Sequence, residues 1–394
     1  MSLSVSSRLA AVRPSPTSAS LALAAELRAQ GRDVIGLGAG EPDFDTPSFI
    51  KDAAVKAIAG GQTKYTPIDG SAELKAAIQR KFARENGLRY ETADILVSSG
   101  AKQSLFNLCL GLLGPGDEAI VPAPYWVSYP DMVRLADATP VIVNAGLDAD
   151  FKISPQQLEA AISKRTRLVI LNSPSNPTGA SYSKAELGAL GAVLERHPQV
   201  VIVADDIYEH IYWADEPFVS FAAACPALFD RTVTVNGVSK AYAMTGWRIG
   251  YAAGPSELIR AMKTIQSQST TNACSVSQAA ACAALDGDQS VVRDMCAAYA
   301  ARHRYIVDAL NALPGFECRP GEGTFYAFPR VEQALGRLGL DNDTALVDRL
   351  LNEADVACVP GSAFGAPGYL RLSFASAMDV LEEAMRRMQR ALSA

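Results

Sequence analysis

Short apolar runs rich in β-branched residues recur along the chain, and each is about as long as a strand buried on both faces. Segments with helical periodicity lie between them, such as residues 101–113 and 184–196. Strands that alternate with helices predict a mostly parallel sheet with helices on both sides. The predicted strands are Ile95 to Val97, Ala119 to Val121, Leu168 to Leu171, Val200 to Val203, Thr232 to Val235 and Ile249 to Ala252.

A further helix is predicted ahead of these strands. Thr46 and Pro47 are the residue types of an N-cap and a first helical position. An apolar stripe follows through Ile50, Val55 and Ile58. Gly60 and Gly61 then end the predicted helix.

The pattern changes after about residue 285, where longer helices begin. An apparent strand lies at 324–328 and a last amphipathic helix at 378–392. We therefore predict an N-terminal arm, residues 1–44, that contributes part of a small domain. A large domain over 45–285 follows, and a small C-terminal α+β domain occupies 286–394.

Composition narrows the class of protein. The 394 residues are 49% apolar and 20% charged, with a formal net charge of -6. A chain of this length is expected to form more than one compact unit. The apolar content excludes a disordered chain, and the net negative charge makes nucleic acid a poor candidate partner.

The seven cysteines contain no C-x-x-C pair, which is typical of buried reduced thiols. The three histidines have no second histidine or cysteine at ligand spacing, so no metal site is predicted. No window reaches 18 uninterrupted apolar residues, and Ser, Arg and Pro interrupt the first 18 residues. We expect a cytoplasmic protein without a membrane partner.

Polar residues follow several of the predicted strands. In an open parallel sheet ligands bind beyond the carboxyl ends of the strands, so these residues are expected to meet at one edge. Taken singly, Asp205 has the character of a helix cap, Lys240 of a surface lysine and Gly100 of an ordinary turn. The residues in question lie at 98–102, 172–179, 205–209, 239–240 and 248.

Together these groups match the requirements of pyridoxal 5'-phosphate. The aldehyde of that cofactor needs a lysine, its pyridine nitrogen a carboxylate, and its ring oxygen hydrogen-bond donors. Its phosphate needs a helix N-terminus and an arginine. The combination therefore predicts this cofactor rather than five unrelated surface features.

Four motifs closely resemble the class I aminotransferases of PLP fold type I, and more narrowly the bacterial aspartate aminotransferases of subgroup Ib. The resemblance runs from about Arg13 to the C-terminus. It implies an α/β fold with a mostly parallel seven-stranded sheet between helices and a smaller α+β domain. The motifs are GEPDF at 40–44, NPTG at 176–179, DDIY at 205–208 and SKAYAMTGWRIG at 239–250.

The resemblance also implies catalytic roles. Lys240 is the lysine that forms a Schiff base with the cofactor and shuttles the substrate α-proton. Asp205 pairs with the pyridine nitrogen, and Asn176 and Tyr208 bind the ring oxygen. Trp126 stacks on the ring. His210 is interpreted as a packing residue, because the transfer needs no second base.

Further residues bind phosphate and substrate by the same resemblance. Gly100, Ala101, Lys102 and Arg248 hold the phosphate, and Tyr65 reaches it from the neighbouring subunit of a homodimer. Arg371 grips the substrate α-carboxylate through its planar fork. Lys102 faces the second carboxylate of a dicarboxylic substrate. The substrate-binding set is Gly40, Lys102, Trp126, Asn176 and Arg371.

The implied activity is ping-pong transfer of an amino group between aspartate or glutamate and 2-oxoglutarate or oxaloacetate. Prephenate, aromatic or neutral amino acids stay open as substrates, as does a PLP-dependent lyase or racemase. Arg13 stands where lysine is common, which leaves the substrate range open. A dehydrogenase is disfavoured because Glu41 and Pro42 follow the glycines of 36–40 where a helix should begin. A regulator of this fold would need an added DNA-binding domain.

Overall fold

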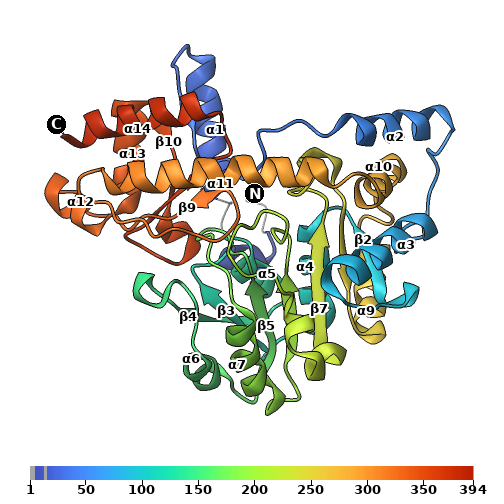
Figure 1. The fold of residues 1–394 in the computed structure, drawn as a ribbon. Helices are drawn as coiled ribbons and strands as arrows, with labels where there is room; N and C mark the ends of the chain where they lie inside the picture. Colours follow the sequence, from blue (N-terminus) through green and yellow to red (C-terminus); the bar gives the residue numbers. More distant parts are fainter. Residues whose placement is uncertain (1–4, 13–15, 394) are drawn as a thin grey trace.

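A computed structural model describes residues 5–12 and 16–393, and its core is a seven-stranded sheet (Figure 1). The strand order is β2-β8-β7-β6-β5-β3-β4. β8 runs antiparallel to both neighbours, and the other neighbouring strands pair in parallel. This confirms the predicted fold class. The strands are β2 (Ile95–Ser98), β3 (Glu118–Ala123), β4 (Thr139–Asn144), β5 (Thr166–Asn172), β6 (Val201–Asp205), β7 (Thr232–Gly237) and β8 (Gly250–Ala253).

Helices cover both faces of this sheet, because its strands are apolar on both sides. On one face Leu105 of α4 packs in the same cluster as Val121 and Ile170. On the other face Leu187 of α7 packs with Val169. The helices before and around the sheet are α1 (Pro16–Ala29), α2 (Ser48–Ala59), α3 (Ala72–Lys81), α4 (Ala101–Leu112), α5 (Tyr129–Leu135), α6 (Pro155–Ala161), α7 (Lys184–Glu195), α8 (Phe221–Ala224), α9 (Ser256–Ser267) and α10 (Ser275–Asp286).

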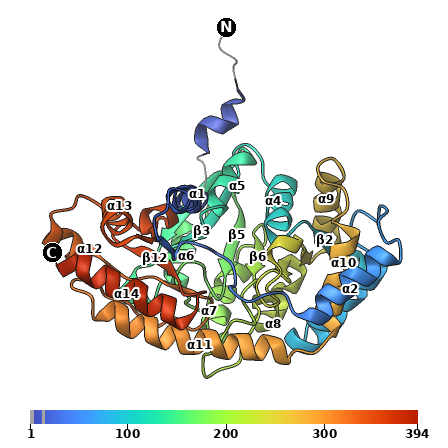
Figure 2. The ribbon, with the colours of Figure 1, turned by 90° about the horizontal axis from the view of Figure 1, so that it is seen from above.

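A second group of elements lies beside the sheet and contains segments from both the N-terminal and the C-terminal part of the chain. β1 (Ile35–Gly36) pairs in parallel with β10 (Val356–Ala357). β11 (Val359–Pro360), β12 (Leu370–Ser373) and β9 (Tyr326–Ala327) form a three-stranded antiparallel sheet. The long helix α11 (Ser290–Asn311) extends along both groups (Figure 2). The remaining helices are α12 (Glu332–Leu338), α13 (Asp343–Ala354) and α14 (Met378–Ser393).

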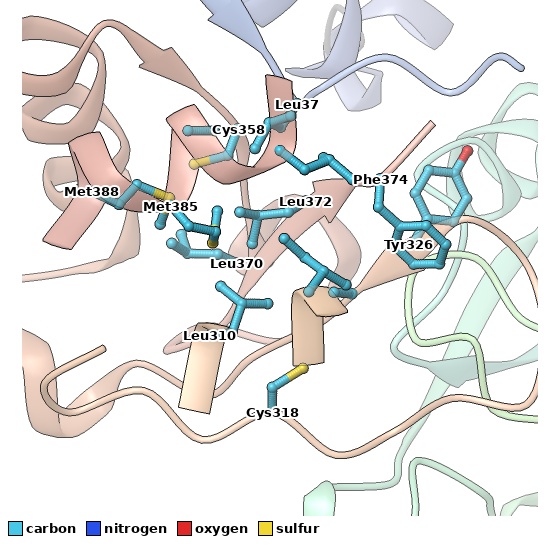
Figure 3. Packing of buried hydrophobic residues seen from close by; sticks show 14 of the residues in the cluster. Leu37, Leu310, Cys318, Tyr326, Cys358, Leu370, Leu372, Phe374, Met385 and Met388 are labelled. Atoms are coloured by element: carbon cyan, nitrogen blue, oxygen red, sulfur yellow. The ribbon is translucent and has the colours of Figure 1, made fainter. Parts of the chain in front are cut away.

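One large apolar cluster holds this second group together. Leu37 of the N-terminal segment packs there with Leu372 of β12 and Met388 of α14 (Figure 3). Tyr326 belongs to the same cluster, and its ring lies at the cluster edge in Figure 3. The N-terminal segment therefore contributes to the packing of the C-terminal elements, while the domain boundaries near residues 44 and 285 stay a prediction.

Several local features differ from what the sequence pattern indicates. Strand β4 was not among the predicted runs; it is a partly exposed edge strand that contains Pro140. Thr46 is not the N-cap of α2: Pro47 holds that position, and the Thr46 hydroxyl donates to Ala243 O over 2.7 Å. In the expected apolar stripe, Ile50 is buried but Val55 and Ile58 are 63% and 58% exposed.

Two further expectations concern the burial of the cysteines and the presence of membrane-spanning helices. The cysteines are not all buried, since Cys274 is exposed. Within the described residues, none of the helices has both the length and the apolar content that a bilayer crossing requires.

Candidate active site

The carboxyl ends of β5, β6 and β7 open into a cavity of about 420 Å³. Residues from the N-terminal segment and from β12 close its other side. Ten of the residues predicted for the site line this one cavity: Gly40, Ala101, Lys102, Trp126, Asn176, Asp205, Tyr208, Lys240, Arg248 and Arg371. The residues that follow the apolar strands therefore meet at one edge of the sheet, as the sequence predicts.

Lys240 supplies the amine of the cavity. It follows β7 by three residues, and its Nζ donates to the Gly40 carbonyl oxygen over 2.5 Å. Burial and the nearby Arg371 lower the pKa of Lys240 to about 8. The neutral form of this amine is therefore far more populated near physiological pH than that of an ordinary lysine, and a neutral amine can act as a nucleophile or a base.

Asp205 is the last residue of β6 and is 4% exposed. Burial raises the pKa of its carboxyl to about 6, although the Tyr129 hydroxyl, which donates to Oδ2 over 2.6 Å, lowers it. Tyr129 opens α5 and is a residue that the sequence analysis missed. The pair presents a carboxylate that is held in one orientation at the base of the cavity.

An anion cradle lies at the N-terminus of α4. Gly100 caps this helix with φ 86°, and a Cβ there would come within 2.3 Å of Arg248 Nη2. A Cβ on Gly250 would likewise meet Ala101 N at 2.1 Å. The loop therefore requires glycine at both positions so that Arg248 and the helix N-terminus can approach each other.

Arg371 projects from β12 into the same cavity and is 2% exposed. Its Nη2 donates to Gly38 O over 2.7 Å, and its Nη1 donates to Asn176 Oδ1 over 3.1 Å. Its Nε has no partner among the described residues. A buried guanidinium with a free donor is suited to a carboxylate ligand.

Aromatic rings fix the position of Arg371. Its guanidinium carbon lies 4.4 Å from the centroid of Tyr326 and 4.9 Å from that of Phe364. The Tyr326 hydroxyl lies 3.0 Å from the Tyr208 hydroxyl, and a Cβ on Gly40 would come within 2.8 Å of it. Tyr326 lines the cavity and was also missed, because it belongs to a strand outside the central sheet.

Lys102 and Trp126 form one wall of the cavity. The Lys102 ammonium lies 4.8 Å from the centroid of the Trp126 indole. Partial burial and the nearby Arg248 lower the pKa of Lys102. Trp126 also meets Tyr129 edge-on, with ring centroids 5.3 Å apart. This wall offers an aromatic face and a cation to whatever occupies the cavity.

Some predicted residues lie elsewhere. Tyr65 is 91% exposed and does not line the cavity of its own chain. Gly100 lies against the Arg248 guanidinium and does not itself line the cavity. Arg13 lies outside the described residues. His210 is bonded to Glu85 over 2.9 Å, away from the cavity lining, as the packing interpretation expects.

A second charged cluster lies around His210. Glu85, Glu209 and His210 bring metal-ligand atoms within 4.8 Å of one another. The fully buried Lys81 already supplies a cation there, because its ammonium bonds Glu209 and Asn86. This cluster is therefore interpreted as an internal ion pair that supports the segment after Asp205.

The donor set of the cavity fits pyridoxal 5'-phosphate. A glycine-lined helix N-terminus with an arginine suits the phosphate, a buried carboxylate suits a protonated pyridine nitrogen, and a depressed-pKa lysine suits the aldehyde. The observation that tests the fit most strictly is the cradle, where side chains at Gly100 and Gly250 would collide with Arg248 and Ala101, two residues that line the cavity.

Comparisons with known proteins agree with this donor set. The model of the family "Aminotransferase class I and II" matches residues 32–388. The aspartate/prephenate aminotransferase of Nitrosomonas europaea is 55% identical and covers 99% of this chain and 100% of its own. The crystal structure of the aspartate aminotransferase from Rhizobium meliloti superposes with a TM-score of 0.95 at 47% identity, covering 100% of this chain and 99% of that one. The Thermus thermophilus aspartate aminotransferase with maleate has a TM-score of 0.93 at 42% identity, covering 99% and 100%.

Proposed function

The chain belongs to the class I and II aminotransferases, and from this membership we propose that it transfers the amino group of aspartate or glutamate to 2-oxoglutarate or oxaloacetate with pyridoxal 5'-phosphate as its cofactor. One observation carries the substrate class. Arg371, which is buried, and Lys102 both line this cavity. Two cations at separate places suit a substrate with two carboxylates.

The cofactor, when bound, supplies a carbonyl for the amine and a ring that draws electrons from the substrate α-carbon. The cradle of Gly100, Ala101 and Arg248 would hold its phosphate. Asp205 would hold a proton on the pyridine nitrogen, and Trp126 would face the ring. Asn176 and Tyr208 would donate to the ring oxygen, which leaves Lys240 for the aldehyde.

Lys240 then acts as the proton carrier. Its Nζ would take the proton from the substrate α-carbon and pass it to the carbonyl carbon of the cofactor, and the reverse transfer would follow with the 2-oxo acid acceptor. The pKa near 8 supports this role, because an amine of ordinary pKa would be almost fully protonated at neutral pH. The Gly40 carbonyl, which accepts from Nζ, orients the amine toward the cavity.

Substrate orientation rests on Arg371 and Lys102. Arg371 binds the α-carboxylate, which every amino acid and 2-oxo acid has. Lys102 attracts the distal carboxylate of dicarboxylic substrates, and the presence of the dicarboxylate maleate with the Thermus thermophilus enzyme supports that class. The donor leaves as a 2-oxo acid before the acceptor enters the same cavity, which is a ping-pong sequence.

A two-fold dimer completes the site in this proposal. Tyr65 is almost fully exposed, and Val55 and Ile58 present an apolar surface on α2. Exposed apolar side chains of this size support burial against a second copy. Tyr65 would then reach the phosphate bound by the partner.

A panel of donors and acceptors with the purified protein tests the proposal. Aspartate and glutamate should give the highest kcat/KM with 2-oxoglutarate or oxaloacetate. Prephenate belongs on the acceptor list, because it has two carboxylates and the Nitrosomonas europaea relative is named for it. A higher kcat/KM for alanine or phenylalanine than for both dicarboxylates would contradict the proposed substrate class.

A further inference from the structure

Gln266, on α9, is completely buried, and its side-chain amide bonds two segments at once. Its Nε2 donates to Val97 O over 2.8 Å and to Ile68 O over 2.8 Å. Its Oε1 accepts from Asn107 Nδ2 over 3.1 Å. Both amide hydrogens are thus used, each on a carbonyl of a different segment.

The first segment leads into the phosphate cradle of the same chain. Val97 lies in β2, three residues before Gly100. Asn107 lies on α4, the helix whose N-terminus forms the cradle. Gln266 therefore links the strand before the cradle with the helix after it, and α4 and α9 are neighbouring helices (Figure 2).

The second segment carries Tyr65. Ile68 lies three residues after it, and Asp69 O accepts from Val97 N over 3.1 Å. The contact is close, since a Cβ on Gly70 would come within 2.5 Å of a Val97 methyl group. Rotation or displacement of this segment would break these bonds, so the direction in which Tyr65 projects depends on them.

Gln278, on α10, holds the Tyr65 segment independently. Its Oε1 accepts from Ser71 N over 2.7 Å, and its Nε2 donates to Thr66 Oγ1 over 3.0 Å. A further bond joins Nε2 to Ala273 O over 2.8 Å. None of these partners belongs to the phosphate cradle. Gln278 can therefore be compared with Gln266 as a residue that holds the Tyr65 segment without contacting the cradle.

We infer that Gln266 is a positioning residue for the cofactor phosphate in both sites of the dimer: through Val97 it sets the cradle of its own chain, and through Ile68 it sets the Tyr65 that completes the partner's site. The inference rests on the proposed function, in which Tyr65 acts across the dimer. Gln278 would position Tyr65 alone and would affect the partner's site alone.

The test uses Gln266→Met, which keeps the length of the side chain and removes its donors. In the homodimer the dissociation constant of pyridoxal 5'-phosphate should rise roughly 10-fold, because two segments each lose about one hydrogen bond. Gln79→Met is the matched control: the Gln79 amide donates to Tyr90 O over 2.8 Å, away from both segments. Its cofactor affinity should equal that of the wild type.

Mixed dimers separate the two effects. In one hybrid a Gln266→Met chain pairs with a Lys240→Ala chain, so the remaining Lys240 lies beside the altered cradle. In the other hybrid both changes are on one chain, so the remaining Lys240 has a normal cradle and receives Tyr65 from the altered chain. Borohydride treatment and mass spectrometry count the cofactor fixed at that Lys240 as cofactor concentration is varied. In both hybrids the cofactor concentration that gives half-maximal fixation should be roughly 3-fold higher than in a hybrid whose only change is Lys240→Ala on one chain.

Gln278→Met should change the second type of hybrid and leave the first unchanged. A Tyr65→Phe hybrid reports whether Tyr65 acts across the dimer at all. If Tyr65→Phe weakens the partner's site but Gln266→Met leaves either hybrid unchanged, the inference about Gln266 is overturned alone. If neither change acts across the dimer, the inference and the proposed assembly fail together.

A thermal shift with unchanged cofactor affinity in Gln266→Met would show a purely structural role and would also overturn the inference. Should that variant not fold, Asn107→Ser tests the same link, because it removes the donor that orients the Gln266 amide. It should weaken both types of hybrid in the same direction by a smaller factor, and an unchanged affinity in either one counts against the inference.

Discussion

Arg371 and Asn176 form a hydrogen bond of 3.1 Å that connects the two groups of elements around the cavity. Arg371 comes from β12 of the three-stranded sheet, whereas Asn176 follows β5 of the central sheet. The proposed carboxylate site is therefore assembled from both groups. A substrate that binds there contacts the two groups at the same time.

Arg371→Lys should lower kcat/KM for every amino acid substrate. Lysine keeps the charge but loses the planar fork, so at least one charge-assisted hydrogen bond to the α-carboxylate is lost. Such a bond contributes about 1.5 to 3 kcal/mol, or roughly 10- to 150-fold in kcat/KM. Steady-state kinetics with aspartate, alanine and phenylalanine measure this loss. Arg330→Lys, whose partner Glu317 lies outside the cavity lining, serves as the control and should behave as wild type.

Lys102→Ala should act on dicarboxylates selectively. Aspartate and glutamate should lose roughly 10- to 150-fold in kcat/KM, corresponding to about 1.5 to 3 kcal/mol, because one charged contact disappears. Alanine and phenylalanine have no distal carboxylate and should be nearly unaffected. Cofactor affinity is measured in the same variant, since Lys102 borders the cradle. An equal loss for all substrates with cofactor still bound would remove Lys102 from substrate recognition.

Tyr129→Phe should raise the pKa of Asp205 above its value of about 6. The hydroxyl donates to the carboxylate and therefore favours the ionised form, so its removal favours the protonated form. Because the proposed mechanism needs the ionised carboxylate, the acid limb of the kcat/KM profile should move to higher pH. Tyr182→Phe removes a buried hydroxyl that accepts from Ile153 N, and it should leave this limb in place. An unmoved acid limb in Tyr129→Phe would separate Tyr129 from the function of Asp205.

Lys81→Met should destabilise the fold. Lys81 and Glu209 are both buried and bonded, so loss of the ammonium leaves a buried carboxylate without its cation. The free energy of unfolding should fall by about 3 to 5 kcal/mol. Adding Glu209→Gln should recover part of this loss, since the uncompensated charge is removed. Lys51→Met breaks an exposed pair with Asp45 and should leave the free energy of unfolding nearly unchanged in denaturant titrations.

Residues at the ends of apolar strands were the most predictable part of the site. Asp205 and Lys240 could be located from the sequence because Asp205 ends a buried strand and Lys240 closely follows one, and parallel strands direct their carboxyl ends to one edge. Tyr129 could not, because its partner Asp205 lies 76 residues away and no local pattern marks their contact. Tyr326 belongs to a two-residue strand in another sheet, and such a strand leaves little periodicity to detect.

Two features of the fold, strand β4 and the exposure of the α2 stripe, could not be predicted from hydrophobic periodicity. Strand β4 alternates poorly because it lies at the sheet edge, and Pro140 weakens the strand signal further. The stripe of Val55 and Ile58 has the periodicity of a buried face, yet both side chains are exposed in one chain. Hydrophobic periodicity indicates burial without specifying whether the covering surface comes from the same chain or from a second copy.

The central claim, that Lys240 holds the cofactor and carries the proton, is tested most directly by borohydride reduction of the purified protein with pyridoxal 5'-phosphate, followed by peptide mapping. The reduction should fix the cofactor irreversibly to the peptide that contains Lys240, and Lys240→Ala should prevent this fixation and lower kcat by roughly 10^4-fold or more. Fixation of the cofactor to Lys102 or Lys263 instead, with Lys240 unmodified, would contradict the claim.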